Sequence, residues 1–516
     1  MKLHKQQLVE AGWQETPLLD TIYQHAIQLI DQKNITEFNY LKKHLKRDFP
    51  GSHGSLKMLQ SPAPLSLAIQ AKSKDAIKNL AKSQKQMEQL LCCPVIERGV
   101  LMPDACPAGN APAVIPVGGA IAVKNAIIPA AHSADICCSL HASFFVSELD
   151  TSSIMDALQL VTRFGPGGRP EDEQVHHPVL DEAVWNNRFL RRLEQKAKLH
   201  MADQGDGNHF ANLGELQVSA LLLVALRDNG QIDLANALAP HASVKVLVTH
   251  HGSRGLGAAL YKRGLDAAIK HTRKHAKGIP EQAAWLSMST AEGQAYWDAL
   301  QYVSRWTKAN HESIHARFHA ALTTQSIASI GNEHNFIWKR DDVYLHGKGA
   351  TPAWASADGY PLLGLIPLNM AEPILLTVGS NNSDFLSFSP HGAGRNFARK
   401  ALLRRYERKR QGIDTERISS DIRSGTHHID ARWYLGEADV TECPIAYKPA
   451  AEVRSQIQQY NLAEVIAEIQ PLGCIMAGRS PRKEKPLSPK QLRQIQHRAD
   501  RRKVRQHDWH ESCESD

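Results

Sequence analysis

The sequence has no long apolar run. Its most apolar stretch, residues 220–226, is far too short to span a bilayer. Residues 1–20 also lack an apolar core of signal-peptide length. These absences predict a soluble, cytoplasmic protein that has no membrane partner.

Cysteine is scarce and is not arranged as a disulfide framework. The eight cysteines stand mostly in adjacent pairs or alone: Cys92, Cys93, Cys106, Cys137, Cys138, Cys443, Cys474 and Cys513. This spacing excludes a small secreted domain held together by disulfides. We expect reduced thiols, and one or more of them could bind a metal.

The positive charge is concentrated at one end. Of a formal net charge of +8 over 516 residues, most lies in residues 479–516, where eleven Lys/Arg face six Asp/Glu. Such a tail indicates either a polyanion partner or a solvated segment that aids solubility. The overall composition, 42% hydrophobic and 22% charged, is that of a globular protein.

The secondary structure expected from the sequence changes along the chain. The spacing of apolar residues predicts a small helical extension over residues 1–74 and a helix over 75–91. From Val95 onward, short apolar segments separated by glycine and proline predict a β-rich core. A strongly basic helix is expected over 395–410, either as a binding surface or as a solvated face.

One glycine-rich stretch, residues 387–395, sets His391 among small residues with Arg395 four positions later. Glycines let a backbone approach a ligand closely, and the guanidinium offers a fork of donors to phosphate oxygens. A histidine held there can be a nucleophile, a general acid or a metal ligand. The alternative is a glycine turn that holds a hydrogen-bonded histidine.

Other glycine-flanked loops carry side chains that bind metals. They are Asp135, Cys138, His209, His250 and His334. Oxygen, nitrogen and thiolate donors together suit a transition metal better than calcium or magnesium. Five donors are too many for one catalytic zinc with an open position, but they suffice for two metals if a thiolate bridges them. Taken singly, each histidine has a structural alternative, and a buried cysteine is commonly inert.

Cations stand beside these donors, at Arg254, Lys348 and Arg395. Two-metal sites stabilise the in-line displacement of phosphoryl groups, and nearby cations bind the same phosphates. With five other donors available, His391 fits the role of a nucleophile toward phosphate better than that of a sixth ligand.

The chain resembles the RtcB-type RNA ligases over roughly residues 75–478. The family's motifs occur in the family's order: Met102-Pro-Asp104, Asp135-x-x-Cys138, Gly207-Asn-His-Phe210, His250-x-Gly-Ser-Arg-Gly-Leu-Gly257, His334-Asn335, His346-x-Lys-Gly-Ala-Thr351, His391-Gly-Ala-Gly-Arg395 and Ala446-Tyr447-Lys448. The resemblance implies an α+β fold, with one large catalytic domain whose β-sandwich-like core is flanked by helices. Residues 1–74 and 479–516 lie outside it.

The resemblance also implies a reaction and its cofactors. A ligase of this kind uses GTP and two Mn²⁺ ions to join an RNA 2′,3′-cyclic phosphate or 3′-phosphate to a 5′-hydroxyl, in RNA repair or tRNA splicing. Its implied partners are cleaved RNA and an archease-like activator.

By the same resemblance, Cys138 would bridge the two ions, and the other protein ligands would be Asp135, His209, His250 and His334. His391 would carry GMP as a phosphoramidate, and Asp104 would assist near the metals. The residues expected to hold the nucleotide are Asn208, Asn335, Gly394, Arg395 and Tyr447.

The chain departs from the family pattern at a few positions. Asn212 replaces a glutamate, Cys106 a histidine and Met476 a lysine, while residues 370–374 replace a Met-Gly-Thr-x-Ser run. The metal and nucleophile sets are complete, so we expect an active enzyme with an altered base pocket and weaker preference for GTP. Two alternatives are a metal-dependent RNA phosphoesterase and a non-catalytic RNA-binding relative.

Overall fold

The computed structural model describes residues 1, 3–14, 18–50, 52, 54, 56–408 and 412–480. Nearly all of the basic tail lies outside these residues, so its binding to a polyanion stays a prediction. No helix in the described part of the chain is long and apolar enough to cross a membrane.

The larger sheet has eight strands and carries most of the site. In spatial order the path runs β13 (Leu363–Pro367), β14 (Ile374–Gly379), β19 (Ala463–Met476), β6 (Phe210–Gln217), β7 (Ser243–His251), β5 (Ser139–Phe145) and β9 (Ala328–Glu333), while β18 (Asp430–Trp433) pairs with β19. The two ends of this path meet, because Asn332 on β9 accepts a hydrogen bond from the Leu365 backbone on β13 at 2.9 Å. The sheet is therefore nearly closed around an apolar interior.

The second sheet has five strands, in the order β1 (Leu65–Leu67), β2 (Ile96–Cys106), β3 (Val117–Lys124), β11 (Val343–Lys348) and β10 (Asn335–Arg340). All its pairs are antiparallel except β1 with β2. Three short pairs complete the strands: β12 (Ala350–Pro352) with β15 (Phe388–Pro390), β4 (Ala126–Ile127) with β8 (Leu286–Ser287), and β16 (Glu407–Arg408) with β17 (Gly412–Ile413).

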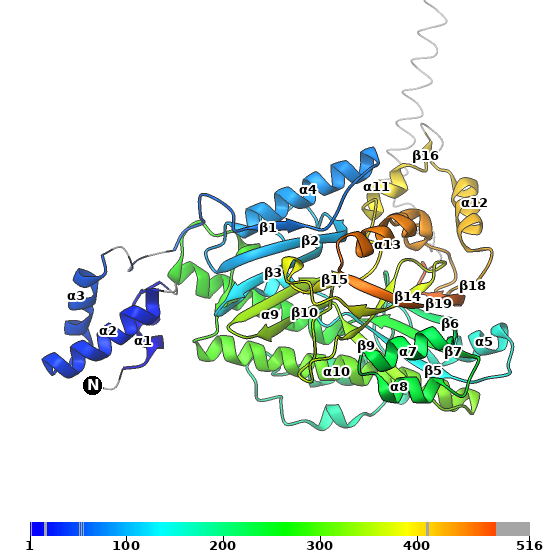
Figure 1. Ribbon diagram of the computed structural model, residues 1–516, viewed down its shortest axis with the longest axis horizontal. Coiled ribbons are helices and arrows are strands. Elements are labelled where there is room, and N and C mark those ends of the chain that lie inside the picture. The colour runs from blue at the N-terminus through cyan, green and yellow to red at the C-terminus, as the bar shows by residue number, and fades with distance from the viewer. Residues whose placement is uncertain are drawn as a thin grey trace, which may run out of the picture. The chain divides into compact units, whose positions relative to one another are not determined.

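Helices flank the sheets (Figure 1). Their bounds are α4 (Lys74–Leu91), α5 (Thr151–Val161), α6 (Glu194–Leu199), α7 (Ala220–Asp228), α8 (Ile232–Leu238), α9 (Arg254–His275), α10 (Ala291–Leu322), α11 (Arg399–Arg404), α12 (Thr415–Thr426) and α13 (Ala450–Gln459). The mixed α/β architecture confirms the fold class expected from the sequence, and α4 matches the helix predicted over 75–91 to within one residue.

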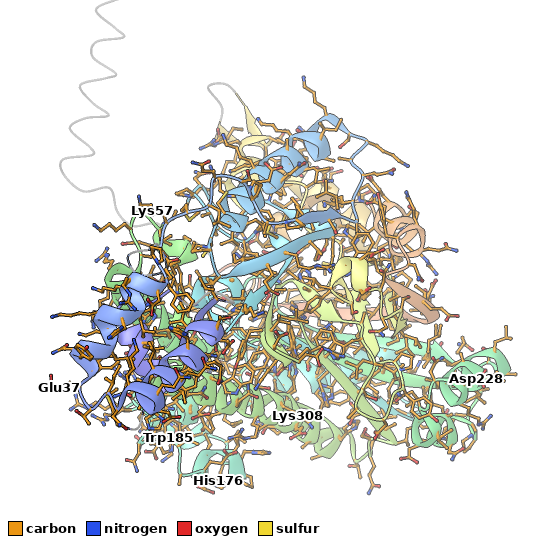
Figure 2. All side chains as sticks on the ribbon, turned by 60° about the vertical axis from the view of Figure 1, so that its left-hand side comes forward. Glu37, Lys57, His176, Trp185, Asp228 and Lys308 are labelled. Atoms are coloured by element: carbon orange, nitrogen blue, oxygen red, sulfur yellow. The ribbon has the colours of Figure 1, made fainter. Side chains whose placement is uncertain are left out.

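Helix α10 fixes the strands that lead into the site. Lys308 marks its exposed side (Figure 2), while the opposite side is buried against β5 and β7. There His311 and His315 hydrogen-bond to the Thr249 hydroxyl at 2.7 and 2.9 Å, and His311 also contacts the Ser139 hydroxyl at 3.0 Å. These buried polar bonds hold two strand ends at a fixed separation, because each group would lose its partner if the strands moved.

The N-terminal extension is helical, as predicted, with α1 (Lys5–Glu10), α2 (Leu18–Lys33) and α3 (Phe38–Asp48). The apolar faces of these helices meet in a core of their own, which includes Trp13, Ile22 and Leu41. Strand β1, which falls inside the range predicted as the extension, pairs with β2 and so belongs to the five-stranded sheet.

The basic helix expected over 395–410 is much shorter. Helix α11 ends at Arg404, and the chain then turns into β16. Lys400 and Arg404 stand four residues apart with Arg408 next in the series, and like charges at this spacing destabilise a helix. The turn instead buries Tyr406 beside Val440, which a continuous helix would not do.

Candidate active site

Four neighbouring strands of the eight-stranded sheet deliver the predicted metal ligands at their ends. Cys138 immediately precedes β5, His250 lies at the end of β7, His209 precedes β6, and His334 follows β9. The register brings these ends together, because Phe210 pairs with His250, and Ser139 pairs with both His251 and Glu333. Pairing of the strands therefore gathers ligands that are far apart in the sequence.

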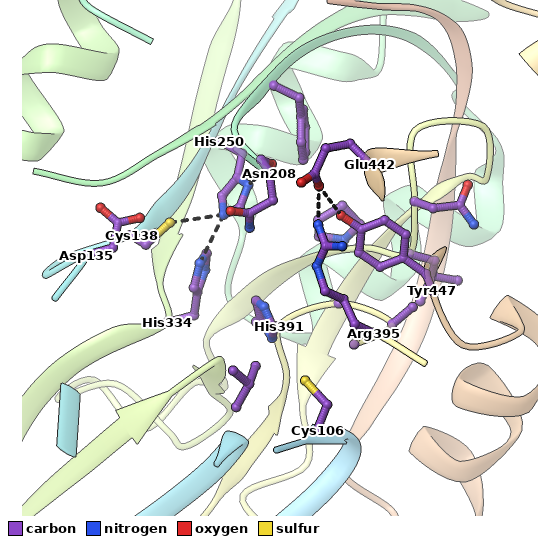
Figure 3. A pocket seen from close by; sticks show the side chains of 18 of the residues that line it. Cys106, Asp135, Cys138, Asn208, His250, His334, His391, Arg395, Glu442 and Tyr447 are labelled. Carbon is purple, nitrogen blue, oxygen red and sulfur yellow. Dashed lines mark hydrogen bonds and ion pairs between the residues drawn. The ribbon is translucent and has the colours of Figure 1, made fainter. Parts of the chain in front are cut away.

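The predicted ligands converge on the thiol of Cys138 (Figure 3). The Sγ atom lies 3.1 Å from Nε2 of His250 and 3.7 Å from Nε2 of His209. His250 Nε2 lies 3.1 Å from His334 Nε2, and His209 Nε2 lies 2.8 Å from a carboxylate oxygen of Asp135.

These five residues form two groups that could each hold a metal ion. One is Cys138, His250 and His334, the other Asp135, Cys138 and His209, and within each group the ligand atoms lie within 4.8 Å of one another. Cys138 belongs to both groups, as a bridging thiolate requires.

The protonation states fit a metal site. His250 Nδ1 lies 3.2 Å from the Asn208 carbonyl and donates to it, so its Nε2 lone pair points into the cluster. Burial lowers the pKa of His250 to about 3 and that of His334 well below its usual value, so both rings are neutral ligands. Burial, together with Asp135, raises the pKa of the Cys138 thiol, and a bound cation would reverse that effect.

His391 lies beside this cluster and outside both metal groups. It follows β15, and its ring centroid is 4.9 Å from that of His334. Its Nδ1 lies 2.5 Å from Oδ2 of Asp104, a fully buried carboxylate on β2. The carboxylate accepts a hydrogen bond from Nδ1–H. The ring proton is then on Nδ1, and Nε2 has the free lone pair.

Asp104 therefore contacts His391 directly, and the assistance near the metals that the resemblance implied stays a prediction. Two glycines, one beside His391 and one beside Asp104, allow these two residues to approach each other closely. A Cβ at Gly349 would lie 2.7 Å from His391 Nδ1, and a Cβ at Gly394 would lie 2.0 Å from the Asp104 carbonyl oxygen. Gly394 also has φ +71°, a backbone conformation that favours glycine, so a side chain there would strain the backbone as well as collide with Asp104.

A buried carboxylate, Glu442, organises the basic side of the site. It pairs with the guanidinium of Arg395 and accepts hydrogen bonds from Arg399 at 2.8 Å and from the Tyr447 hydroxyl at 2.9 Å. Arg395 also lies over the Tyr447 ring, 5.1 Å from its centroid (Figure 3). Sequence reasoning missed Glu442. The only local signal was its place five residues before Tyr447.

Most of these residues line one cavity of about 590 Å³, namely Asp135, Cys138, His250, His334, His391, Arg395, Arg399, Glu442 and Tyr447. His209 and Asp104 are not among its lining residues. Asn208, Asn335 and Lys348 also line it. Asn335 accepts a hydrogen bond from the Gly349 N–H at 2.8 Å and donates one to the Asp135 carbonyl at 3.2 Å. It therefore links Gly349, beside His391, to Asp135 in one of the metal groups. The volume is in the range of small-molecule and cofactor sites.

The family model described as "tRNA-splicing ligase RtcB" matches residues 171–477, which is more than half of the chain. The chain belongs to the RtcB family. The RNA-splicing ligase RtcB of Escherichia coli (strain K12) is 23% identical over 395 residues, which is 70% of this chain and 86% of the relative. The tRNA-splicing ligase RtcB of Thermococcus kodakarensis is 26% identical over 315 residues, 54% of this chain and 61% of the relative.

The match to the RtcB model begins after Asp104 and Cys138 in the sequence. Both residues nevertheless lie in the same site as His209, His250 and His391, which fall within the matched range. The early part of the chain therefore contributes directly to the RtcB-like site.

Two predicted cations have different positions in this RtcB-family site. Lys348 lines the cavity, donates to the Ile115 carbonyl at 3.2 Å, and has a pKa lowered to about 8 by burial. Arg254 is not among the cavity's lining residues. Its Nε lies 3.6 Å from Asp203, and it packs beside Gly205, behind His209.

The positions that depart from the RtcB pattern differ in whether they line the cavity. Met476 lines the cavity and packs with Met370 and Phe210, and Cys106 also lines the cavity. Asn212 is buried opposite Cys474 on β19, beyond the lining residues. Glu372 is not a lining residue either, so the departures from the family pattern that line the cavity are Cys106 and Met476.

Proposed function

We propose that this protein is an RNA ligase that joins a 2′,3′-cyclic phosphate or 3′-phosphate end to a 5′-hydroxyl end through a histidine–GMP intermediate. Membership of the RtcB family and the names of its relatives support RNA ligation. The observation that carries the finer proposal is the Asp104–His391 pair, because it leaves a nucleophilic nitrogen beside two metal groups that share one thiol.

The donor set fits two manganese ions. Asp135 and His209 would hold one ion, His250 and His334 the other, and the Cys138 thiolate would be common to both. Bound there, the ions would neutralise charge on phosphate oxygens during displacement.

His391 performs the first step with its Nε2 lone pair. A nitrogen–phosphorus bond forms at the α-phosphorus of GTP, and the bond to the β-phosphate oxygen breaks to release pyrophosphate. Asp104 stabilises the positive charge that the imidazole ring gains, because its carboxylate stays ionised and accepts a hydrogen bond from Nδ1–H in a buried site.

A 2′,3′-cyclic phosphate is first hydrolysed to a 3′-phosphate, as water adds at phosphorus, the bond to the 2′-oxygen breaks and that oxygen takes a proton. Two further displacements then complete the reaction. An oxygen of the RNA 3′-phosphate attacks the phosphorus of the adduct, and the bond to His391 breaks. The 5′-hydroxyl then attacks the 3′-phosphorus, loses its proton to solvent or base, and GMP leaves. Arg395, which pairs with Glu442 and lines the cavity, would bind the phosphate oxygens throughout.

The test is a ligation assay with one 3′-phosphorylated and one 5′-hydroxyl RNA, with GTP and Mn²⁺ supplied or withheld in turn. The proposal expects joined RNA only when both are present, and none from His391→Ala. Opening of a cyclic phosphate with Mn²⁺ alone, without joining, would instead favour a phosphoesterase. The archease-like activator and the cytoplasmic location stay predictions.

A further inference from the structure

An exposed face of α4 carries lysines at regular intervals. Lys74, Lys78 and Lys82, which we call the α4 stripe, stand four residues apart and are all exposed. Side chains at this spacing share one helix face, about 6 Å apart along the axis. The buried face of α4 packs through Met87 and Leu91, so the stripe points away from that core.

The middle of α4 contacts two segments that include or adjoin residues lining the cavity. The Asn79 side chain donates to the Asn396 carbonyl, next in sequence to Arg395, which lines the cavity. Lys82 Nζ donates to the Asn110 side-chain oxygen at 2.8 Å, in the loop whose first residues, Cys106 and Pro107, line the cavity. Two residues of α4, one of them in the stripe, therefore contact segments that continue into the lining of the cavity.

Helix α11 supplies cations between the stripe and the cavity. Arg399 and Lys400 line the cavity. Arg405, just after α11, pairs at 2.6 Å with Asp75, the acidic residue in the first turn of α4. This pair joins the two helices, which lie close together in Figure 1, and it neutralises the carboxylate nearest to Lys74 and Lys78.

We infer that the α4 stripe binds backbone phosphates of the RNA strand whose end enters the cavity, an inference that rests on the proposed function. Lysine binds phosphate as a point charge without reading the base, so this contact would be independent of sequence. Successive phosphates of an extended single strand repeat at a spacing close to that of the lysines. The stripe would thus hold nucleotides that lie outside the cavity.

The test compares the full-length wild type with K74Q/K78Q/K82Q. The control is K262Q/K270Q/K274Q, which removes three exposed lysines from α9. Binding of fluorescent single-stranded 3′-phosphorylated RNA is measured at several salt concentrations without GTP or metal, so that nothing reacts. One RNA has about twelve nucleotides and the other about three, because only the longer one can reach beyond the cavity.

The inference expects the stripe variant to bind the longer RNA at least tenfold more weakly. Its slope of log affinity against log salt should fall by about 2, since each phosphate contact on single strands contributes about 0.7. Affinity for the short RNA, the melting temperature and both affinities of the α9 control should match the wild type.

Equal binding of the longer RNA by the stripe variant and the wild type would overturn the inference. An equal loss in the α9 control would also overturn it, because the effect would then be one of net charge alone. The proposed function fails differently. A wild type that binds long RNA through the stripe but takes no label from GTP keeps this inference and loses the ligase mechanism.

Discussion

Asp104 and His391, 287 positions apart in the chain, are joined by a contact of 2.5 Å between Oδ2 and Nδ1. The carboxylate is fully buried, while the imidazole ring borders the cavity. With its proton on Nδ1, His391 has an unprotonated Nε2, so under the proposed function Nε2 would be the nucleophile.

Asp104→Asn should slow the labelling of the protein by GTP by about a hundredfold or more. The amide keeps the shape of the side chain but loses the charge that fixes the ring and stabilises its positive form. Metal content should be unchanged, because Asp104 lies in neither metal group. Labelling rates are the measurement, with Asp384→Asn at an exposed site as the control. Equal rates in Asp104→Asn and the wild type would exclude the orienting role.

Cys138→Ser should lose bound metal, while Cys137→Ser should keep most of it. Cys138 belongs to both metal groups, and a serine hydroxyl is a poor replacement for a bridging thiolate. Cys137 packs in an apolar cluster instead. Metal analysis of the purified variants decides between them, and the reverse order would move the ligand to Cys137.

The same thiol predicts how metal affinity depends on pH. Its pKa lies above the usual value because of burial, so at neutral pH the thiol is protonated and binding must displace that proton. His250, with a pKa of about 3, releases no proton in this range. Affinity should therefore rise by about tenfold for each pH unit from about pH 6 to about pH 8. A flat profile, measured by calorimetry with Mn²⁺, would contradict a thiolate ligand.

Glu442→Gln should weaken GTP binding by about tenfold and cost about 2 kcal/mol of stability. Glu442 is 2% exposed and receives two guanidinium groups and the Tyr447 hydroxyl, so its loss leaves buried donors without a charged partner. Nucleotide titration and thermal unfolding measure the two effects. Glu416→Gln, at an exposed position of α12, is the matched control and should change neither.

Met476→Lys should sharpen the preference for GTP over ATP by about tenfold, because each polar contact with a base edge contributes roughly 1–3 kcal/mol. Met476 lines the cavity with Met370 and offers no such contact, so the wild type should discriminate weakly. The measurement is the ratio of labelling rates with the two nucleotides at equal Mn²⁺. A wild type that already prefers GTP strongly would show that another residue reads the base.

The candidate metal ligands could be picked out from the sequence because each has glycine or other turn residues close by, although His250 lies within the end of β7. That these strands are neighbours in one sheet was not predictable, since the pairing of β5 with β7 joins segments about a hundred residues apart. The family resemblance grouped these residues as ligands, and the strand pairing came from the structure.

Other features of the site needed the structure. Glu442 is a single carboxylate in a short turn, and nothing in its local sequence shows that it meets Arg395, 47 residues earlier. The end of α11 at Arg404 depends on where Tyr406 is buried, which periodicity does not report. Likewise, Asn212 and Glu372 looked like base contacts in the sequence, but neither lines the cavity, whereas Met476 does.

The central claim is that His391 becomes covalently attached to a nucleotide. The most direct measurement incubates the protein with GTP labelled at the α-phosphate and Mn²⁺, and then maps the labelled peptide by mass spectrometry. The account predicts an acid-labile, alkali-stable GMP adduct on His391, and no label on His391→Ala despite its normal metal content. Label on another residue, or equal labelling of the variant and the wild type, would contradict it.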